Sequence, residues 1–184
     1  MHWRDWHYVI WNLKTTRWAK ETGNIKEIIE IGAVKLGPKL EVLSTFHTYV
    51  KPRIHPILSD YCIKTNGVTQ EQVDSAPTFI QAYNRFVPWV GVGRVRMISW
   101  GTRGKQYFFY TCQMYGKPFK WKYTNINLKN HFTKITGIEN PTLQKALDHY
   151  KIPYNPYKNG SLDLAHNVAE LLIHMSDDLP FVKK

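Results

Sequence analysis

Two polar residues follow the first apolar stretch of the chain, at a place where strands often present chemistry. Asn12 and Lys14 come after the apolar residues 8–11, and Leu13 stands between them. Because side chains alternate along a strand, Asn12 and Lys14 are expected on one face and Leu13 on the other. Two carboxylates at this spacing could hold a divalent metal ion, since Mg²⁺ takes oxygen ligands. The amide of Asn12 and the amine of Lys14 indicate a different chemistry.

Three roles are open to Lys14 from the sequence. Its amine pairs with a carboxylate or reaches solvent along an apolar stem, or it binds a nucleic-acid phosphate. In the third role, desolvation lowers its pKa and the neutral amine forms a Schiff base with a small carbonyl ligand, as in retro-aldol chemistry. Asn12 is expected to be a hydrogen-bonded structural amide.

The stretch 100–121 is rich in aromatic and basic residues. Base stacking combined with phosphate contacts uses such a mixture, and so does the packing of a helix. For the four aromatic residues 107–110 we expect packing for at least two. The candidates for nucleic-acid or pocket contacts are Arg17, Trp100, Arg103, Lys105, Tyr107 and Tyr157.

The composition describes a basic, folded domain. The 184 residues include 25 Lys and Arg against 14 Asp and Glu, a formal net charge of +11. A surplus of this size favours RNA or DNA as a partner, because Lys and Arg release counterions from phosphates. The length predicts a single domain over 1–184.

Membrane and disulfide signals are weak in this sequence. No apolar run is long enough to span a bilayer, and residues 1–7 lack the apolar core of a signal peptide. We therefore expect a cytoplasmic protein without a membrane partner. Cys62 and Cys112 are too few for a disulfide framework, so we expect two buried thiols.

Strands come first along the chain and helices follow. Predicted strands over 8–13, 25–36 and 42–50 are joined by short connections and suggest an antiparallel meander. Further strands are predicted over 94–99 and 123–126. Helices are predicted over 56–65, 77–90, 105–115, 127–135, 142–149 and 162–175, and a capping box at Thr69 and Gln72 marks one more. The order indicates an α/β domain with a mixed sheet, in which sites form at strand ends.

Four stretches, 27–34, 45–52, 56–62 and 67–79, resemble the DEDDh 3′–5′ exonucleases of the RNase T/DnaQ superfamily. Within it the sequence is similar to the histone-mRNA exonuclease-like and KapD-like proteins, over roughly residues 8–175. The resemblance implies an RNase H-like fold with a five-stranded mixed sheet flanked by helices. It also implies two-metal phosphodiester hydrolysis, in which four carboxylates hold the metal ions and a histidine activates water.

The positions that this resemblance assigns to catalysis carry other residues in this chain. The family's Asp-x-Glu, its acidic residue after the fourth strand and its His-x₄-Asp fall on Asn12, Lys14, Gly104 (or, less well, Thr102), Asn159 and Leu164. Asp163 matches a neighbour of the last ligand. We therefore expect no metal cofactor and no metal-dependent nuclease activity.

Two hypotheses follow from substitutions that are confined to one pocket. The first is a pseudoenzyme, an exonuclease-like domain without catalysis that still binds single-stranded RNA or DNA. The alternative is a repurposed or engineered exonuclease scaffold in which Lys14 acts as an amine nucleophile on a carbonyl ligand. Selection for a new binding role and deliberate redesign would both confine the changes in this way.

Overall fold

A five-stranded mixed sheet forms the centre of the molecule. The computed structural model describes residues 6–20, 23–119, 121, 125–154 and 160–182. Its strands are β1 (His7–Thr15), β2 (Ile28–Leu36), β3 (Val42–Tyr49), β4 (Val95–Ser99) and β5 (Asn125–Asn127), arranged in the order β3-β2-β1-β4-β5. The β1–β2 and β2–β3 pairs are antiparallel, whereas β1–β4 and β4–β5 are parallel. The predicted meander followed by parallel strands is confirmed.

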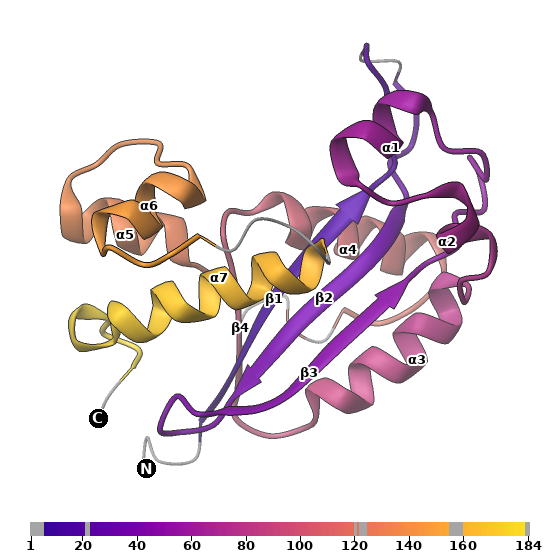
Figure 1. Cartoon of the computed structure of the whole chain (residues 1–184). Coiled ribbons are helices and arrows are strands. Elements are labelled where there is room, and N and C mark those ends of the chain that lie inside the picture. Colours follow the sequence, from indigo (N-terminus) through magenta and orange to yellow (C-terminus); the bar gives the residue numbers. More distant parts are fainter. Residues whose placement is uncertain (1–5, 21–22, 120, 122–124, 155–159, 183–184) are drawn as a thin grey trace.

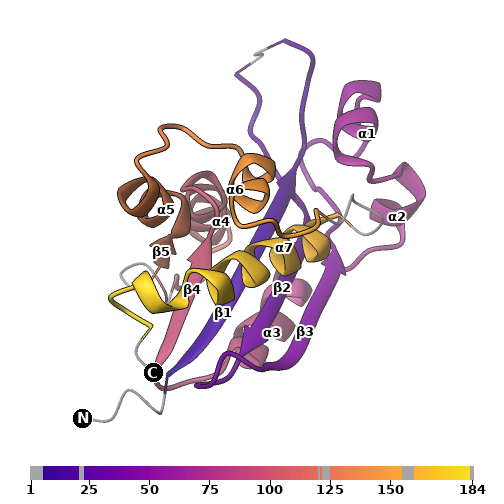
Figure 2. The same cartoon turned by 60° about the vertical axis from the view of Figure 1, so that its left-hand side comes forward.

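Helices cover both faces of this sheet (Figures 1 and 2). They are α1 (Asp60–Asn66), α2 (Gln70–Asp74), α3 (Phe79–Val90), α4 (Arg103–Met114), α5 (Leu128–Thr136), α6 (Leu143–His149) and α7 (Ser161–His174). α7 crosses one face, and α3 and α4 lie behind the other. α5 and α6 pack beside α7 next to the short strand β5. The RNase H-like architecture is therefore confirmed.

Local capping explains where several helices begin. Thr69 and Gln72 form the predicted capping box, which starts α2. The helix predicted from residue 56 begins instead at Asp60, because the Ser59 side chain accepts a hydrogen bond from the N–H of Cys62 and so fixes the first turn there.

Two hydrophobic cores lie on opposite sides of β1. Tyr8 and Ile10 pack toward α5, α6 and α7. Val9 and Trp11 pack toward α3 and α4, and Leu13 adjoins the same cluster. This alternation confirms that even-numbered residues of β1 face α7 and odd-numbered residues face α4.

The two cysteines are buried and unpaired, as predicted. Cys62 lies in α1 and Cys112 in α4. Burial raises the pKa of the Cys112 thiol to about 12, so this group stays protonated near neutral pH. Within the described ranges, no helix has the length and apolar character required to cross a membrane.

Candidate functional site: a basic cavity beside a buried ion pair

Lys14 ends its strand in an ion pair. Its Nζ lies 3.3 Å from Oε2 of Glu30, which is 1% exposed, and it also donates a hydrogen bond to the backbone carbonyl of Asn66 at the end of α1. Carboxylate pairing was the first of the three roles open to this lysine. A carbonyl-attacking amine gains no support here, because Nζ faces a carboxylate and a carbonyl oxygen.

Glu30 joins three elements at this point. Its Oε1 accepts a hydrogen bond of 2.9 Å from the backbone N–H of Ser161, the first residue of α7, and lies 2.8 Å from Nε2 of His47 on β3. A buried carboxylate needs such partners to offset the loss of water. Glu30 therefore ties β1, β3 and α7 to β2.

Two glycines let α7 approach the sheet closely enough for these contacts. A Cβ at Gly32 would overlap the backbone of Leu162, so the helix lies directly on β2. Gly160 precedes α7 with a φ of 68°, and a Cβ there would meet the Glu30 carboxylate and the Lys14 amine. Only glycine fits this left-handed and crowded position.

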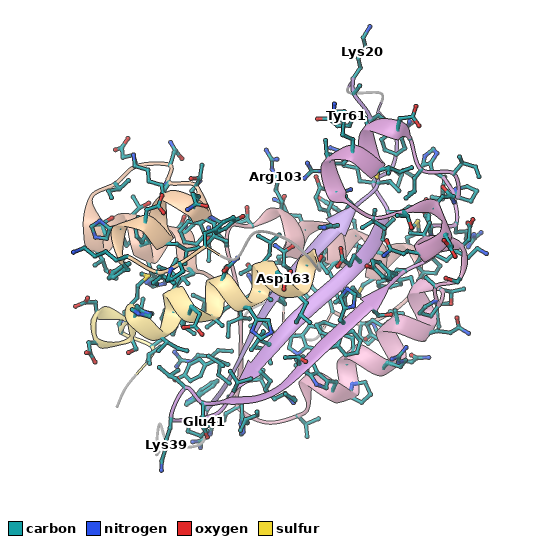
Figure 3. All side chains as sticks on the ribbon, in the orientation of Figure 1. Lys20, Lys39, Glu41, Tyr61, Arg103 and Asp163 are labelled. Carbon is teal, nitrogen blue, oxygen red and sulfur yellow. The ribbon has the colours of Figure 1, made fainter. Side chains whose placement is uncertain are left out.

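A cavity of about 670 Å³ opens beside the ends of β1 and β4, between the starts of α4 and α5 and the described residues of the segment that joins β1 to β2. Its basic lining residues are Arg17, Lys20, Lys26, Arg103 and Lys129. Among the described residues that line it, none is Asp or Glu. Figure 3 shows Lys20, Tyr61 and Arg103 at one end of the molecule and Lys39 and Glu41 at the other. The cavity is therefore suited to an anion.

The remaining lining residues are mainly aromatic and amide side chains. They include Trp18, Tyr61, Trp100, Tyr107, Asn12, Asn24, Asn127, Asn130 and Asn140. Aromatic faces can stack on bases, and amides can donate and accept hydrogen bonds at base edges. The cavity thus combines three kinds of group that bind nucleic acid.

Asn127 holds two walls of the cavity together. Its Oδ1 accepts hydrogen bonds from the backbone N–H groups of Gly101, just after β4, and Lys129, in the first turn of α5. Its Nδ2 donates to Oδ1 of Asn130. This network fixes the start of α5 against the end of β4, where the parallel strands β4 and β5 finish.

Four of the five basic residues that line the cavity have no carboxylate partner among the described residues. Arg17, Lys20, Arg103 and Lys129 form no ion pair with any carboxylate in the described part of the chain. Arg17, Lys20 and Arg103 are also exposed. They remain able to neutralise a bound anion.

The structure brings together six of the candidate residues. Asn12, Arg17, Trp100, Arg103, Gly104 and Tyr107 line the cavity, whereas Lys14, Lys105 and Leu164 do not. Tyr157 and Asn159 lie outside the described residues. In the aromatic run, Phe108 is fully buried, Phe109 packs against Phe119, and Tyr110 is 62% exposed. The expectation that at least two of the four pack is confirmed.

Sequence reasoning missed three of the basic lining residues. Lys20 and Lys26 come from the loop after β1, and Lys129 comes from the first turn of α5. The only signal available was the position of Lys129 just after a potential capping residue, Asn127, at a predicted strand end.

The described residues do not fit a divalent metal ion. Over the ranges that the structure describes, no group of three or more His, Cys, Asp or Glu side chains converges in a way that could hold one. Hard divalent cations need several oxygen ligands, with carboxylates prominent among them. Asp163, in the first turn of α7, is buried and does not line the cavity.

Sequence comparison relates the chain to exonucleases. Residues 19–99 match the family model described as exonuclease, RNase T. Human 3′–5′ exoribonuclease 1 is 32% identical over 174 residues, an alignment that covers 86% of this chain and 50% of that protein. The chain therefore spans about half the length of this relative.

Solved structures agree with the sequence comparison. The nuclease domain of 3′hExo, described as a DEDDh family member bound to rAMP, superposes with a TM-score of 0.87 at 25% identity and covers 97% of this chain and 94% of that one. A 3′-exonuclease described as recognising the 3′ end of a histone mRNA stem-loop gives 0.84 at 26% identity, covering 94% and 82%.

The fold and the position of the cavity at the strand ends define an RNase H-like exonuclease fold. The sequence matches add a similarity to the exonuclease (RNase T) family over residues 19–99 and to 3′–5′ exonucleases of the 3′hExo type.

Proposed function

We propose that this protein is a catalytically inactive member of the exonuclease family that binds single-stranded RNA or DNA in the basic cavity. The observation that carries the proposal is the lining of the cavity, with five basic residues and no acidic one among its described members. Two-metal hydrolysis requires carboxylates to hold the ions. Asn12 and Gly104 line the cavity where the family resemblance expects two of them.

The same lining supports binding of nucleic acid without a metal. Lys and Arg side chains neutralise phosphates directly and release their counterions. The aromatic side chains of Trp18, Trp100 and Tyr107 offer faces on which bases can stack. A solved neighbour is described as recognising an RNA 3′ end, and the human relative is named as an exoribonuclease.

The phosphate contacts are assigned to Arg17, Arg103 and Lys129. Lys14 is left out because its amine contacts Glu30 and Asn66 and does not line the cavity. No observation favours the alternative of a Schiff-base enzyme, so we do not carry it further.

Binding can be tested with a short fluorescent single-stranded RNA, by anisotropy, at low salt and with EDTA present. Reversing the charge of a phosphate contact with Arg103→Glu should weaken the affinity by about tenfold or more. Lys39→Glu makes the same charge change on an exposed lysine at the far end of the molecule and should have a much smaller effect.

The two variants separate the cavity from the overall charge of the protein. Equal losses for Arg103→Glu and Lys39→Glu would mean that RNA binds to the basic surface in general and would contradict the assigned cavity. No binding by the unmodified protein would remove the proposed function altogether.

A further inference from the structure

We infer that a nucleic-acid strand held in the cavity continues along the exposed side of α4, and that Tyr110 on this helix stacks on one of its bases. This inference rests on the proposed function and extends it to a contact surface outside the cavity. Its basis is the distribution of charge along the chain, the alignment of four side chains on α4 and the exposure of Tyr110.

The positive charge of the chain is concentrated in one acid-free segment, residues 75–138. This segment contains ten Lys and Arg and no Asp or Glu, whereas the other 120 residues contain 15 Lys and Arg against 14 Asp and Glu. Nearly all of the net charge of +11 therefore comes from the acid-free segment. It forms α3, β4, α4, β5 and α5. A polyanion that leaves the cavity gains most by staying beside these elements.

The helices on the two faces of the sheet differ in charge as a result. α3 and α4, which both belong to the acid-free segment, lie on one face, and α7 crosses the other (Figure 1). Residues 139–184, which include α6 and α7, contain six Asp and Glu against five Lys and Arg, and Asp148, Glu170 and Asp178 are exposed. These carboxylates repel phosphates, so the side of α4 is the favoured path for the rest of the strand.

Four side chains form a stripe along α4 that begins in the cavity. Their spacing of three or four residues places them on one side of the helix. The stripe consists of Arg103, Tyr107, Tyr110 and Met114. Arg103 and Tyr107 line the cavity. Tyr110 follows Arg103 by about two turns, or about 10 Å along the helix axis, so the stripe leads out of the cavity.

Tyr110 has the exposure that a stacking residue needs. It is 62% exposed, and Met114, one turn further along the stripe, is 42% exposed. The Tyr110 ring lies beside that of Phe109, with 5.6 Å between the ring centroids, and it remains largely open to solvent. An aromatic face in such a position can stack on any base, while the surrounding positive charge holds the phosphates.

The test measures binding of a fluorescent single-stranded RNA of about 12 nucleotides by anisotropy, with EDTA present. Tyr110→Ala should weaken the affinity about fivefold or more, because a stacked base loses its aromatic partner. Tyr110→Phe keeps the ring and should bind like the unmodified protein. Ile80→Ala is the control, since it shortens an exposed apolar side chain on α3, outside the stripe, and should have little effect.

The length of the RNA separates the stripe from the cavity. The longer RNA should bind at least about tenfold more tightly than a dinucleotide, measured as its competitor, because only the longer strand reaches Tyr110. Tyr110→Ala should reduce this gain. Arg103→Glu, which changes the cavity, should weaken binding of the longer RNA in any case.

Unchanged affinity of Tyr110→Ala for the longer RNA would overturn the inference. Equal losses for Tyr110→Phe and Tyr110→Ala, or equal affinities for the dinucleotide and the longer RNA, would overturn it as well. In each of these cases the proposed function stands if Arg103→Glu still weakens binding. Failure of the unmodified protein to bind the longer RNA would overturn both.

Discussion

Lys14 and Glu30 form the best-defined charge contact at the end of β1. The two residues are direct neighbours across the antiparallel β1–β2 pair, and their charged atoms lie 3.3 Å apart. Glu30 is 1% exposed, so its carboxylate depends on protein partners. We interpret Lys14 as the counter-charge that allows Glu30 of β2 to be buried next to the start of α7.

Replacing Lys14 with methionine should destabilise the protein. The change keeps the apolar stem and removes the ammonium, which leaves a buried carboxylate with a lost partner. We expect the free energy of unfolding to fall by about 3 kcal/mol. Urea denaturation followed by tryptophan fluorescence measures this quantity.

The double variant Lys14→Met with Glu30→Gln is the control, because it also removes the carboxylate charge. It should regain part of the lost stability, since the polar amide can still accept the Ser161 N–H. A Lys14→Met protein as stable as the unmodified one would contradict the role assigned to Lys14.

The role of Lys14 could not be decided from the sequence alone. Its partner Glu30 lies 16 positions away, and only the register of the β1–β2 pair brings the two together. The antiparallel meander was predictable, but its register was not. That Asn12 and Lys14 stand where the family has Asp-x-Glu is an expectation from the resemblance, and it stays a prediction.

At the scale of elements, α7 can lie close to the sheet because Gly32, beneath it on β2, has no side chain. Gly32→Ala places a methyl group against the backbone at Leu162, and relief requires a shift of the whole helix. We expect a loss of at least about 2 kcal/mol in the free energy of unfolding, as for overpacked cores. Thermal or urea denaturation would measure it.

Gly104→Ala is a matched control for Gly32→Ala. Its added methyl group would contact only Leu13, at a comfortable distance, and alanine favours a helix over glycine. Its stability should stay within about 1 kcal/mol of the unmodified protein. Equal effects of the two substitutions would mean that α7 does not lie on β2 as described.

Most elements were predictable because local signals agreed with the hydrophobic pattern. The strands carry apolar alternation or continuous apolar runs, and Thr69 and Thr78 form capping boxes at the starts of α2 and α3. The cavity was less predictable, since its walls come from a loop, two helix starts and α1. Lys20 and Lys129 both line the cavity although they lie far apart in the sequence, and the parallel pairing of β5 with β4 places the α5 start that carries Lys129.

At the scale of the whole molecule, the net charge of +11 exceeds the five basic groups at the cavity. Basic groups outside the cavity therefore add to the binding of polyanions that we propose. The salt dependence of binding should distinguish the two contributions, because each phosphate contact to a single strand adds a slope of about −0.7 in log K against log salt.

Arg103→Gln should make that slope shallower by about 0.7, whereas Lys39→Gln should leave it nearly unchanged. Titrations of the same RNA at several salt concentrations give the slope. If Lys39→Gln changed the slope as much as Arg103→Gln does, the assignment of the phosphate contacts to the cavity would be contradicted.

The central claim is that the protein binds a nucleic-acid strand without cutting it. The most direct measurement incubates an end-labelled single-stranded RNA with the protein, in Mn²⁺ and in EDTA, and examines each sample on native and denaturing gels. The account predicts a shifted band on the native gel and a full-length strand on the denaturing gel under both conditions. Metal-dependent shortening of the RNA would contradict the claim, because other residues would then be holding the catalytic ions.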